Sequence, residues 1–253
     1  MQRIELMGCP MDVASMGETV TTIRDAVAAR RFTQHVVVNV AKLVNMRTDP
    51  QLDASVRACD IINIDGMGVV IGARFLGHDV PERVAGVDLF HALLAMSAQE
   101  GFSVFLLGAK DEVVSTAAAK VQALYPGLKL AGYHHGYFWD DEAAMVDTIR
   151  ASGAQLLFVA ITSPKKENFI NRWRDQLGVS FVMGVGGTFD VVAGKVKRAP
   201  LWMQKYGLEW LYRVIQEPGR MWKRYLVTNV RFGGLLVREK LRQVLRKPSA
   251  GTR

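Results

Sequence analysis

Residues 60–70 read DIINIDGMGVV, an apolar run that ends in an acidic residue and is followed by two glycines. The run is short and rich in isoleucine, which is typical of a buried strand. Similar runs occur at residues 35–40, 102–108, 128–134, 154–161 and 179–185. Between them lie stretches of helical periodicity, at residues 18–31, 86–100, 111–124, 140–151 and 164–177. This alternation predicts βαβ units, and therefore an α/β fold with a mainly parallel sheet flanked by helices.

The composition of the 253-residue chain is that of an ordinary globular protein, with 49% hydrophobic and 22% charged residues. Residues 1–10 do not resemble a signal peptide, and the chain lacks an uncharged apolar run of about 18 residues that would span a membrane. Cys9 and Cys59 form no CxxC or Cys/His pattern, which favours a reducing, cytoplasmic compartment. The histidines have no metal-ligand spacing, so we predict no metal site.

Positive charge is concentrated in the last quarter of the chain. From Lys195 onward, fifteen Lys and Arg residues stand against three glutamates, a net charge of +12, whereas residues 1–194 carry a net charge of −4. This asymmetry indicates that one part of the molecule meets an anionic surface or ligand. We therefore expect an α/β domain at residues 1–194 and a basic helical appendage at residues 195–253.

Residues 219–245 have the pattern of one long amphipathic helix, about 40 Å long at 1.5 Å per residue. Apolar residues such as Trp222, Leu226 and Val230 alternate there with Arg and Lys. Two interpretations stay open. The helix either lies on a membrane interface that carries anionic lipid, or packs on the domain or on a second subunit with its basic face in solvent. Whether the protein is a homo-oligomer is likewise left open.

The residues that follow the predicted strands are polar or small, and ligands of open α/β sheets bind beyond those strand ends. They include Asn39, Asp65, Gly108 and the glycines of residues 184–187. Because Gly, Asn and Asp are common in turns for local reasons, the pattern alone does not establish a site. Asp65 is the sharpest candidate, since a carboxylate there can accept a proton from a hydroxyl group. An Asp at this junction can equally cap a helix.

Residues 183–190 read MGVGGTFD, a glycine-rich turn between a strand and a helix that can present backbone N–H groups to a phosphate. The turn is neither a GxGxxG fingerprint nor a Walker A loop, which disfavours an NAD enzyme. Because the chain also contains no Asp-x-Asp pair, arginines rather than Mg²⁺ would have to neutralise the diphosphate of a nucleotide sugar. We predict no cofactor.

Several stretches of the sequence resemble those of a known protein family. Residues 184–200 (GVGGTFDVVAGKVKRAP) and 207–226 (GLEWLYRVIQEPGRMWKRYL) resemble the WecG/TagA/CpsF family of bacterial glycosyltransferases. Residues 81–86 (PERVAG) and 106–110 (LLGAK) extend the resemblance, which covers most of residues 35–226. The resemblance implies a Rossmann-like fold and an inverting, metal-independent transferase. Such enzymes move a hexose, of the N-acetylmannosamine type or glucose, from a UDP-sugar to a polyprenyl-diphosphate-linked sugar.

Carried over by position, the resemblance implies roles for individual residues. The general base falls on Asp65, with Asn39 and Arg83 as further catalytic residues. The implied substrate-binding residues are Gly108, Tyr137, Lys166, Glu167, Gly184, Gly186, Gly187, Phe189, Asp190, Arg213, Arg220 and Arg224. The last three belong to the appendage, which the resemblance implies closes over the diphosphate and docks on the cytoplasmic face of an anionic membrane.

Two departures from the family pattern bear on specificity. Val37 stands where a Thr is common, and Lys166 stands where the family has the Gln of P-x-Q-E. The second change replaces a neutral amide with a cation, so donor or acceptor preference can differ from that of the N-acetylmannosamine enzymes. Two other functions stay open: a UDP-sugar- or NAD-dependent oxidoreductase or epimerase, and a noncatalytic protein that binds anionic surfaces. No nucleic-acid-binding module is recognisable, so we expect no nucleic acid partner.

Overall fold

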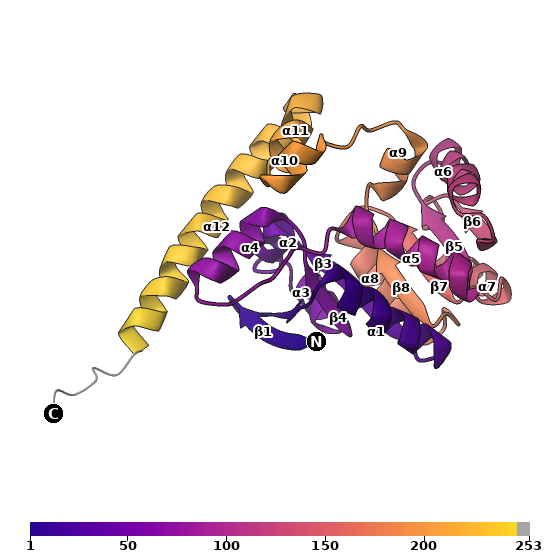
Figure 1. Ribbon diagram of the computed structural model, residues 1–253, viewed down its shortest axis with the longest axis horizontal. Coiled ribbons are helices and arrows are strands. Elements are labelled where there is room, and N and C mark those ends of the chain that lie inside the picture. Colours follow the sequence, from indigo (N-terminus) through magenta and orange to yellow (C-terminus); the bar gives the residue numbers. More distant parts are fainter. Residues whose placement is uncertain (247–253) are drawn as a thin grey trace.

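The described residues of the computed structural model, 1–246, form an α/β fold around an eight-stranded sheet in the order β1-β2-β4-β3-β8-β7-β5-β6 (Figure 1). All neighbouring strands are parallel except the pair β1 and β2. The strands are β1 (Gln2–Leu6), β2 (Cys9–Val13), β3 (Thr33–Val38), β4 (Ile61–Ile64), β5 (Ser103–Gly108), β6 (Lys129–His134), β7 (Leu156–Ala160) and β8 (Phe181–Gly184). The predicted α/β class, with its mainly parallel sheet, is confirmed.

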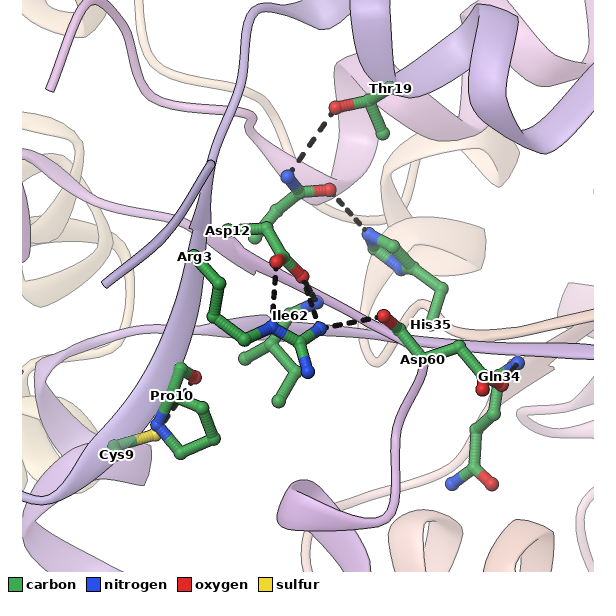
Figure 2. Close-up of polar contacts among 10 residues, drawn as sticks. Arg3, Cys9, Pro10, Asp12, Thr19, Gln34, His35, Asp60 and Ile62 are labelled. Atoms are coloured by element: carbon green, nitrogen blue, oxygen red, sulfur yellow. Dashed lines mark hydrogen bonds and ion pairs between the residues drawn. The ribbon is translucent and has the colours of Figure 1, made fainter. Parts of the chain in front are cut away.

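The N-terminal hairpin β1–β2 was not predicted; buried apolar side chains, such as Leu6 and Met11, and polar contacts both attach it to the sheet. The Arg3 guanidinium donates two hydrogen bonds to the Asp12 carboxylate, each 2.8 Å long, and a third to the Asp60 carbonyl at 2.7 Å (Figure 2). Asp12 also accepts the Ile62 N–H at 2.8 Å. The buried carboxylate of Asp12 therefore joins the hairpin to β4, which is the edge of the predicted sheet.

Beside these contacts, a buried polar cluster joins β3 and β4 to the helix α1 (Met16–Ala28). Nε2 of His35 lies 2.8 Å from Oδ1 of Asn63, whose amide donates to the Thr19 hydroxyl at 3.4 Å (Figure 2). Burial lowers the pKa of His35 to about 4, although the bond to Asn63 opposes the shift. The ring is therefore neutral at pH 7 and fixes the packing of the sheet.

Helices cover both faces of the sheet, and the alternation of side chains along β7 shows how. Leu156 and Phe158 pack with α5 and α6 in one apolar cluster, whereas Leu157 and Val159 pack with α7 and α8 in another. The helices of the domain after α1 are α2 (Val40–Asn45), α3 (Pro50–Arg57), α4 (Met67–Phe75), α5 (Gly86–Glu100), α6 (Asp111–Leu124), α7 (Glu142–Ala151), α8 (Lys165–Trp173) and α9 (Thr188–Ala193). The helices predicted from periodicity are all present, while the short helices α2, α3, α4 and α9 were not predicted.

The C-terminal segment forms α10 (Leu201–Lys205), α11 (Glu209–Gln216) and the long helix α12 (Pro218–Arg246), which confirms the predicted long helix. In Figure 1, α12 lies beside α4 and extends past the domain. Phe232 of α12 is buried against Gly72 of α4, where an added Cβ would lie 2.8 Å from the Phe232 ring. One face of α12 therefore packs on the domain, while Trp222 and Val230 remain exposed.

No helix within residues 1–246 is both long enough and apolar enough to span a membrane.

Candidate active site

The carboxyl ends of β4, β3 and β8 are neighbours at one edge of the sheet, and each is followed by a candidate residue. Asp65 follows β4, Asn39 follows β3, and Gly184 ends β8. Adjacent strands are about 4.8 Å apart, so these residues span about 10 Å. After β3 the chain continues to β4, its neighbour on one side. After β8, the neighbour of β3 on the other side, the chain forms α9, which packs against α6 over the opposite half of the sheet. Such divergence of connections marks the crevice where α/β folds bind ligands.

Asp65 lies at this end of β4 and keeps part of its surface accessible. Its carboxylate accepts the backbone N–H of Gly86, the first residue of α5. The helix α4 begins at Met67, and its N-cap residue is Gly66, without any side-chain cap. The alternative that Asp65 caps the helix after it is therefore wrong.

Charges from two distant segments act on Asp65. Burial raises the pKa of Asp65 above its ordinary value, and the nearby carboxylate of Glu209 raises it further. The guanidinium groups of Arg83 and Arg213 oppose this increase. Because a raised pKa makes a carboxylate a stronger base, the environment of Asp65 suits proton acceptance from a hydroxyl group.

Ion pairs attach the appendage to the domain beside Asp65. Nη1 of Arg83 pairs with Oε2 of Glu209 at the start of α11, and both side chains are largely buried, at 15% and 25% exposure. Nε of Arg198 lies 3.6 Å from Oε1 of the same glutamate. Arg198 in turn donates from Nη2 to Oδ2 of Asp88 in α5 at 2.7 Å. The network thus connects α5, the segment after α9, and α11.

Asn39 acts as the N-cap of α2. Its Oδ1 accepts the backbone N–H of Lys42 at 3.0 Å. An added Cβ on Gly66 would lie 3.9 Å from the Cβ of Asn39, so the amide group stands next to the Asp65-Gly66 corner. The side-chain amide carries two further donor hydrogens for a ligand.

A buried cluster of three charges lies under the same edge of the sheet. Nζ of Lys42 is 2.8 Å from Oε1 of Glu167, and Nζ of Lys166 is 2.6 Å from the same oxygen. The three side chains are only 3–7% exposed, and Lys42 also donates to the Val37 carbonyl at 2.8 Å. Burial alone would raise the pKa of Glu167, but Lys42 and Lys166 lower it to about 2. Glu167 is therefore ionised throughout the physiological range.

Lys42 is a member of this cluster that sequence reasoning missed. It follows Asn39 by three residues in a short helix, where a lysine side chain is normally expected to be exposed to solvent. Lys166 was predicted as a substrate-binding residue, and its aliphatic part lies against the end of β8. An added Cβ on Gly184 would lie 2.8 Å from Cε of Lys166. Gly184 thus makes room for the lysine beneath the glycine-rich turn.

The charge cluster leads to a prediction about stability. Replacing Glu167 by Gln leaves two ammonium groups without their shared carboxylate, and we expect the free energy of unfolding at pH 7 to fall by about 3–5 kcal/mol. In the unmodified protein, the stabilisation by Glu167 should be present above its ordinary pKa of 4.5 and lost as the pH falls toward about 2. Urea denaturation measures both effects, with the exposed Glu112→Gln as control. Equal stability of the two variants would contradict the prediction.

Gly108 and Tyr137 lie farther along the strand ends. Gly108 ends β5 with φ +124°, and an added Cβ would lie 2.4 Å from the carbonyl oxygen of Ala160 in β7, so only glycine fits there. The N–H of Gly136 bonds to the Ala109 carbonyl at 2.8 Å, which brings the loop after β6 over this corner. Tyr137, in the same loop, is largely exposed and therefore accessible to a ligand.

The glycine-rich turn connects β8 to α9. Gly186 has a positive φ of +55°, and Gly187, the N-cap of α9, is exposed. Phe189 does not fit its predicted substrate contact, because its side chain is fully buried and packs against Phe90 at a centroid distance of 5.9 Å. The Asp190 carbonyl accepts the N–H of Lys195 at 2.9 Å, so its backbone shapes the path toward the appendage.

Of the three predicted appendage arginines, Arg213 is exposed on α11 and close enough to Asp65 to affect its pKa. Arg220 and Arg224 belong to α12, but their side chains lie outside the described part of the structure. Within residues 1–246, no group of three His, Cys, Asp or Glu residues is placed to hold a metal ion.

Comparisons with known proteins identify the family of the chain. Residues 4–246 match the glycosyl transferase WecG/TagA/CpsF family. The chain is similar to an N-acetylglucosaminyldiphosphoundecaprenol N-acetyl-beta-D-mannosaminyltransferase of Bacillus spizizenii, with 38% identity over 70% of this chain and 68% of the relative. It is also similar to the protein of the same description in Bacillus subtilis strain 168, with 40% identity over 64% of this chain and 62% of the relative. The chain is therefore a glycosyltransferase that belongs to the WecG/TagA/CpsF family.

Proposed function

We propose that this enzyme transfers a hexose from a UDP-sugar to a sugar linked to polyprenyl diphosphate, with inversion and without a metal ion, in the synthesis of a surface polysaccharide. The observation that carries the proposal is that Asp65 directly follows β4 at the carboxyl end of the sheet, where the charges of Arg83 and Arg213 act on its carboxylate. The names of the two relatives support an undecaprenyl-diphosphate-linked acceptor.

The reaction requires one base and one group of cations. In the proposed step, Asp65 accepts the proton of the acceptor hydroxyl while that oxygen forms a bond to C1 of the donor sugar. The bond between C1 and the diphosphate oxygen breaks, and the electron pair leaves with UDP. Attack opposite the leaving group inverts the configuration at C1. Arg83 and Arg213 stabilise the negative charge that develops on the departing diphosphate.

In this proposal, residues 1–194 form the catalytic domain. The appendage, residues 195–253, supplies exposed aromatic rings and basic side chains, which suit a membrane that holds a lipid-linked acceptor. Trp202, Trp210 and Trp222 are exposed on α10, α11 and α12. The same segment is rich in Lys and Arg, and each basic residue contributes on the order of 1 kcal/mol near an anionic bilayer. We propose that the appendage rests on the cytoplasmic face of the cell membrane, where the diphosphate of the acceptor lies.

Product analysis tests the proposed function most directly. The purified chain is incubated with UDP-glucose, UDP-N-acetylglucosamine, UDP-N-acetylmannosamine and synthetic prenyl-diphosphate sugars, and the products are read by mass spectrometry. Addition of one hexose residue to the lipid-linked sugar in the presence of EDTA is the expected result. No product from any donor, together with thermal stabilisation by NAD but not by UDP, would favour the oxidoreductase alternative. Binding to vesicles without any turnover would favour the noncatalytic alternative.

The lysine at position 166 leads to a prediction about donor preference. Lys166→Gln restores the neutral amide that is usual in the family, and we expect kcat/KM for UDP-N-acetylmannosamine relative to UDP-glucose to rise about tenfold. A tenfold change corresponds to about 1.4 kcal/mol, within the range that one altered pocket contact supplies. Lys165→Gln is the matched control, because Lys165 is exposed and lies 4.9 Å from the centroid of the Trp139 ring. An unchanged ratio in the Lys166→Gln enzyme would remove position 166 from donor selection.

A further inference from the structure

The carboxylate of Glu209 is shared by two arginines, one from the domain and one from the start of the appendage. Arg83 precedes α5, whereas Glu209 opens α11, and the two residues are 126 positions apart in the chain. Arg198, which lies in the segment after α9, approaches the other oxygen of the same carboxylate at 3.6 Å. Because two guanidinium groups converge on one acid, the position of α11 is coupled to the position of Arg83.

This contact differs from an ordinary surface ion pair. Exposed pairs contribute about 0–1 kcal/mol, since water screens them and both side chains lose freedom. Arg83 and Glu209 are only 15% and 25% exposed, and Arg198 is fixed from its far side by Asp88. Such a pair has a defined geometry, so the guanidinium of Arg83 is held in one place rather than sampling several.

The groups that act on Asp65 come from α5, from the loop that precedes α5, and from α11. From the domain side these are the N–H of Gly86 and the guanidinium of Arg83. From α11 they are Glu209 and Arg213, so the same helix brings one anion and one cation to the catalytic carboxylate. Undocking α11 would remove both and release Arg83 from its partner.

We propose that Glu209 is a positioning residue for the transfer reaction: its carboxylate holds Arg83 in place and fixes the start of α11 beside it. The inference rests on the proposed function, since it assigns Arg83 and Arg213 to the leaving diphosphate. Glu209 itself need not touch the substrate. It acts through the two guanidinium groups that it holds.

Glu209→Gln tests this role, because the amide keeps the size of the side chain but loses its charge. We expect kcat to fall at least tenfold while KM for the UDP-sugar changes less than threefold. The acid limb of the pH profile of kcat/KM should move to lower pH, since removing a neighbouring negative charge lowers the pKa of Asp65. Glu209→Asp should keep the acid limb and recover part of kcat. Glu239→Gln, which removes an acid near the far end of α12, should change neither quantity.

Hydrogen–deuterium exchange supplies a readout that needs no substrate. Amides of α11 should exchange faster in the Glu209→Gln protein than in the unmodified protein or in the Glu239→Gln control. Unchanged exchange together with an unmoved acid limb would overturn the positioning role. A different outcome would separate the two proposals. If the unmodified enzyme transfers no hexose, but the amides of α11 exchange faster in the Glu209→Gln protein, the proposed function is refuted and the docking contact is supported.

Discussion

Replacing Asp65 by Asn is expected to lower kcat by about 10²–10⁴-fold, the contribution typical of a positioned general base. The amide has nearly the shape of the carboxylate and can still accept the Gly86 N–H, but it cannot take a proton from the acceptor hydroxyl. UDP affinity should therefore change little, because Arg83 and the glycine-rich turn remain in place. Steady-state assays with lipid-linked acceptor and calorimetric titration of UDP measure the two quantities.

The same variant should be at least as stable as the unmodified protein. Because the folded environment raises the pKa of Asp65, its ionised form costs stability. That cost is absent at pH values below the ordinary pKa, appears as the pH rises, and is complete above the raised pKa. Asp175→Asn, at a 93% exposed surface position, is the control for both measurements. Full activity of the Asp65→Asn enzyme would remove Asp65 as the base.

Removal of residues 201–253 should lower turnover of a lipid-linked acceptor by at least about 10³-fold. A single stabilising group for developing charge is worth about 10²–10³-fold, and the truncation removes Arg213 together with the glutamate that holds Arg83. It should also abolish sedimentation with anionic vesicles, because the exposed tryptophans of the appendage are lost. Normal turnover by the truncated chain would contradict both the closure and the anchoring roles.

Full-length variants separate those two roles. Arg213→Ala should reduce kcat while vesicle binding persists, since only one of many basic residues of the appendage is lost. Trp222→Ser combined with Val230→Ser should weaken vesicle binding while activity on a short, water-soluble prenyl acceptor persists. Both apolar side chains are exposed, so their replacement leaves the packing of Phe232 on Gly72 intact.

The sequence predicted the elements whose periodicity is set by burial. Strands such as β7 are buried on both faces and therefore appear as continuous apolar runs, and α12 is recognisable by its length alone. The hairpin β1–β2 was missed because its strands are short and carry polar residues, and because the Arg3–Asp12 contact within it joins residues nine positions apart and gives no periodic signal. Polar contacts between distant segments are invisible to a pattern of local spacing.

The residues of the candidate site likewise include some that the sequence predicted and some that it did not. Asp65 and Asn39 were predictable because both directly follow strands, and strand ends meet at one edge of a parallel sheet. Lys42 and Glu209 were not, because their importance comes from partners 125 or more positions away in the chain. The predicted substrate contact of Phe189 was wrong for a related reason. A glycine-rich turn indicates that a ligand can approach the backbone closely, but not which neighbouring side chain is buried in the core.

The charge of the C-terminal appendage has a consequence for the proposed docking on an anionic bilayer. Because the two ends of the chain differ so strongly in charge, the protein behaves as an electric dipole with the appendage at its positive pole. In the field of a negatively charged bilayer, that dipole turns the molecule before first contact, so that most encounters begin with the appendage foremost. Salt screens this electrostatic attraction, whose range is about 8 Å at physiological ionic strength. Added salt should therefore slow the association of the protein with the bilayer more than it speeds dissociation.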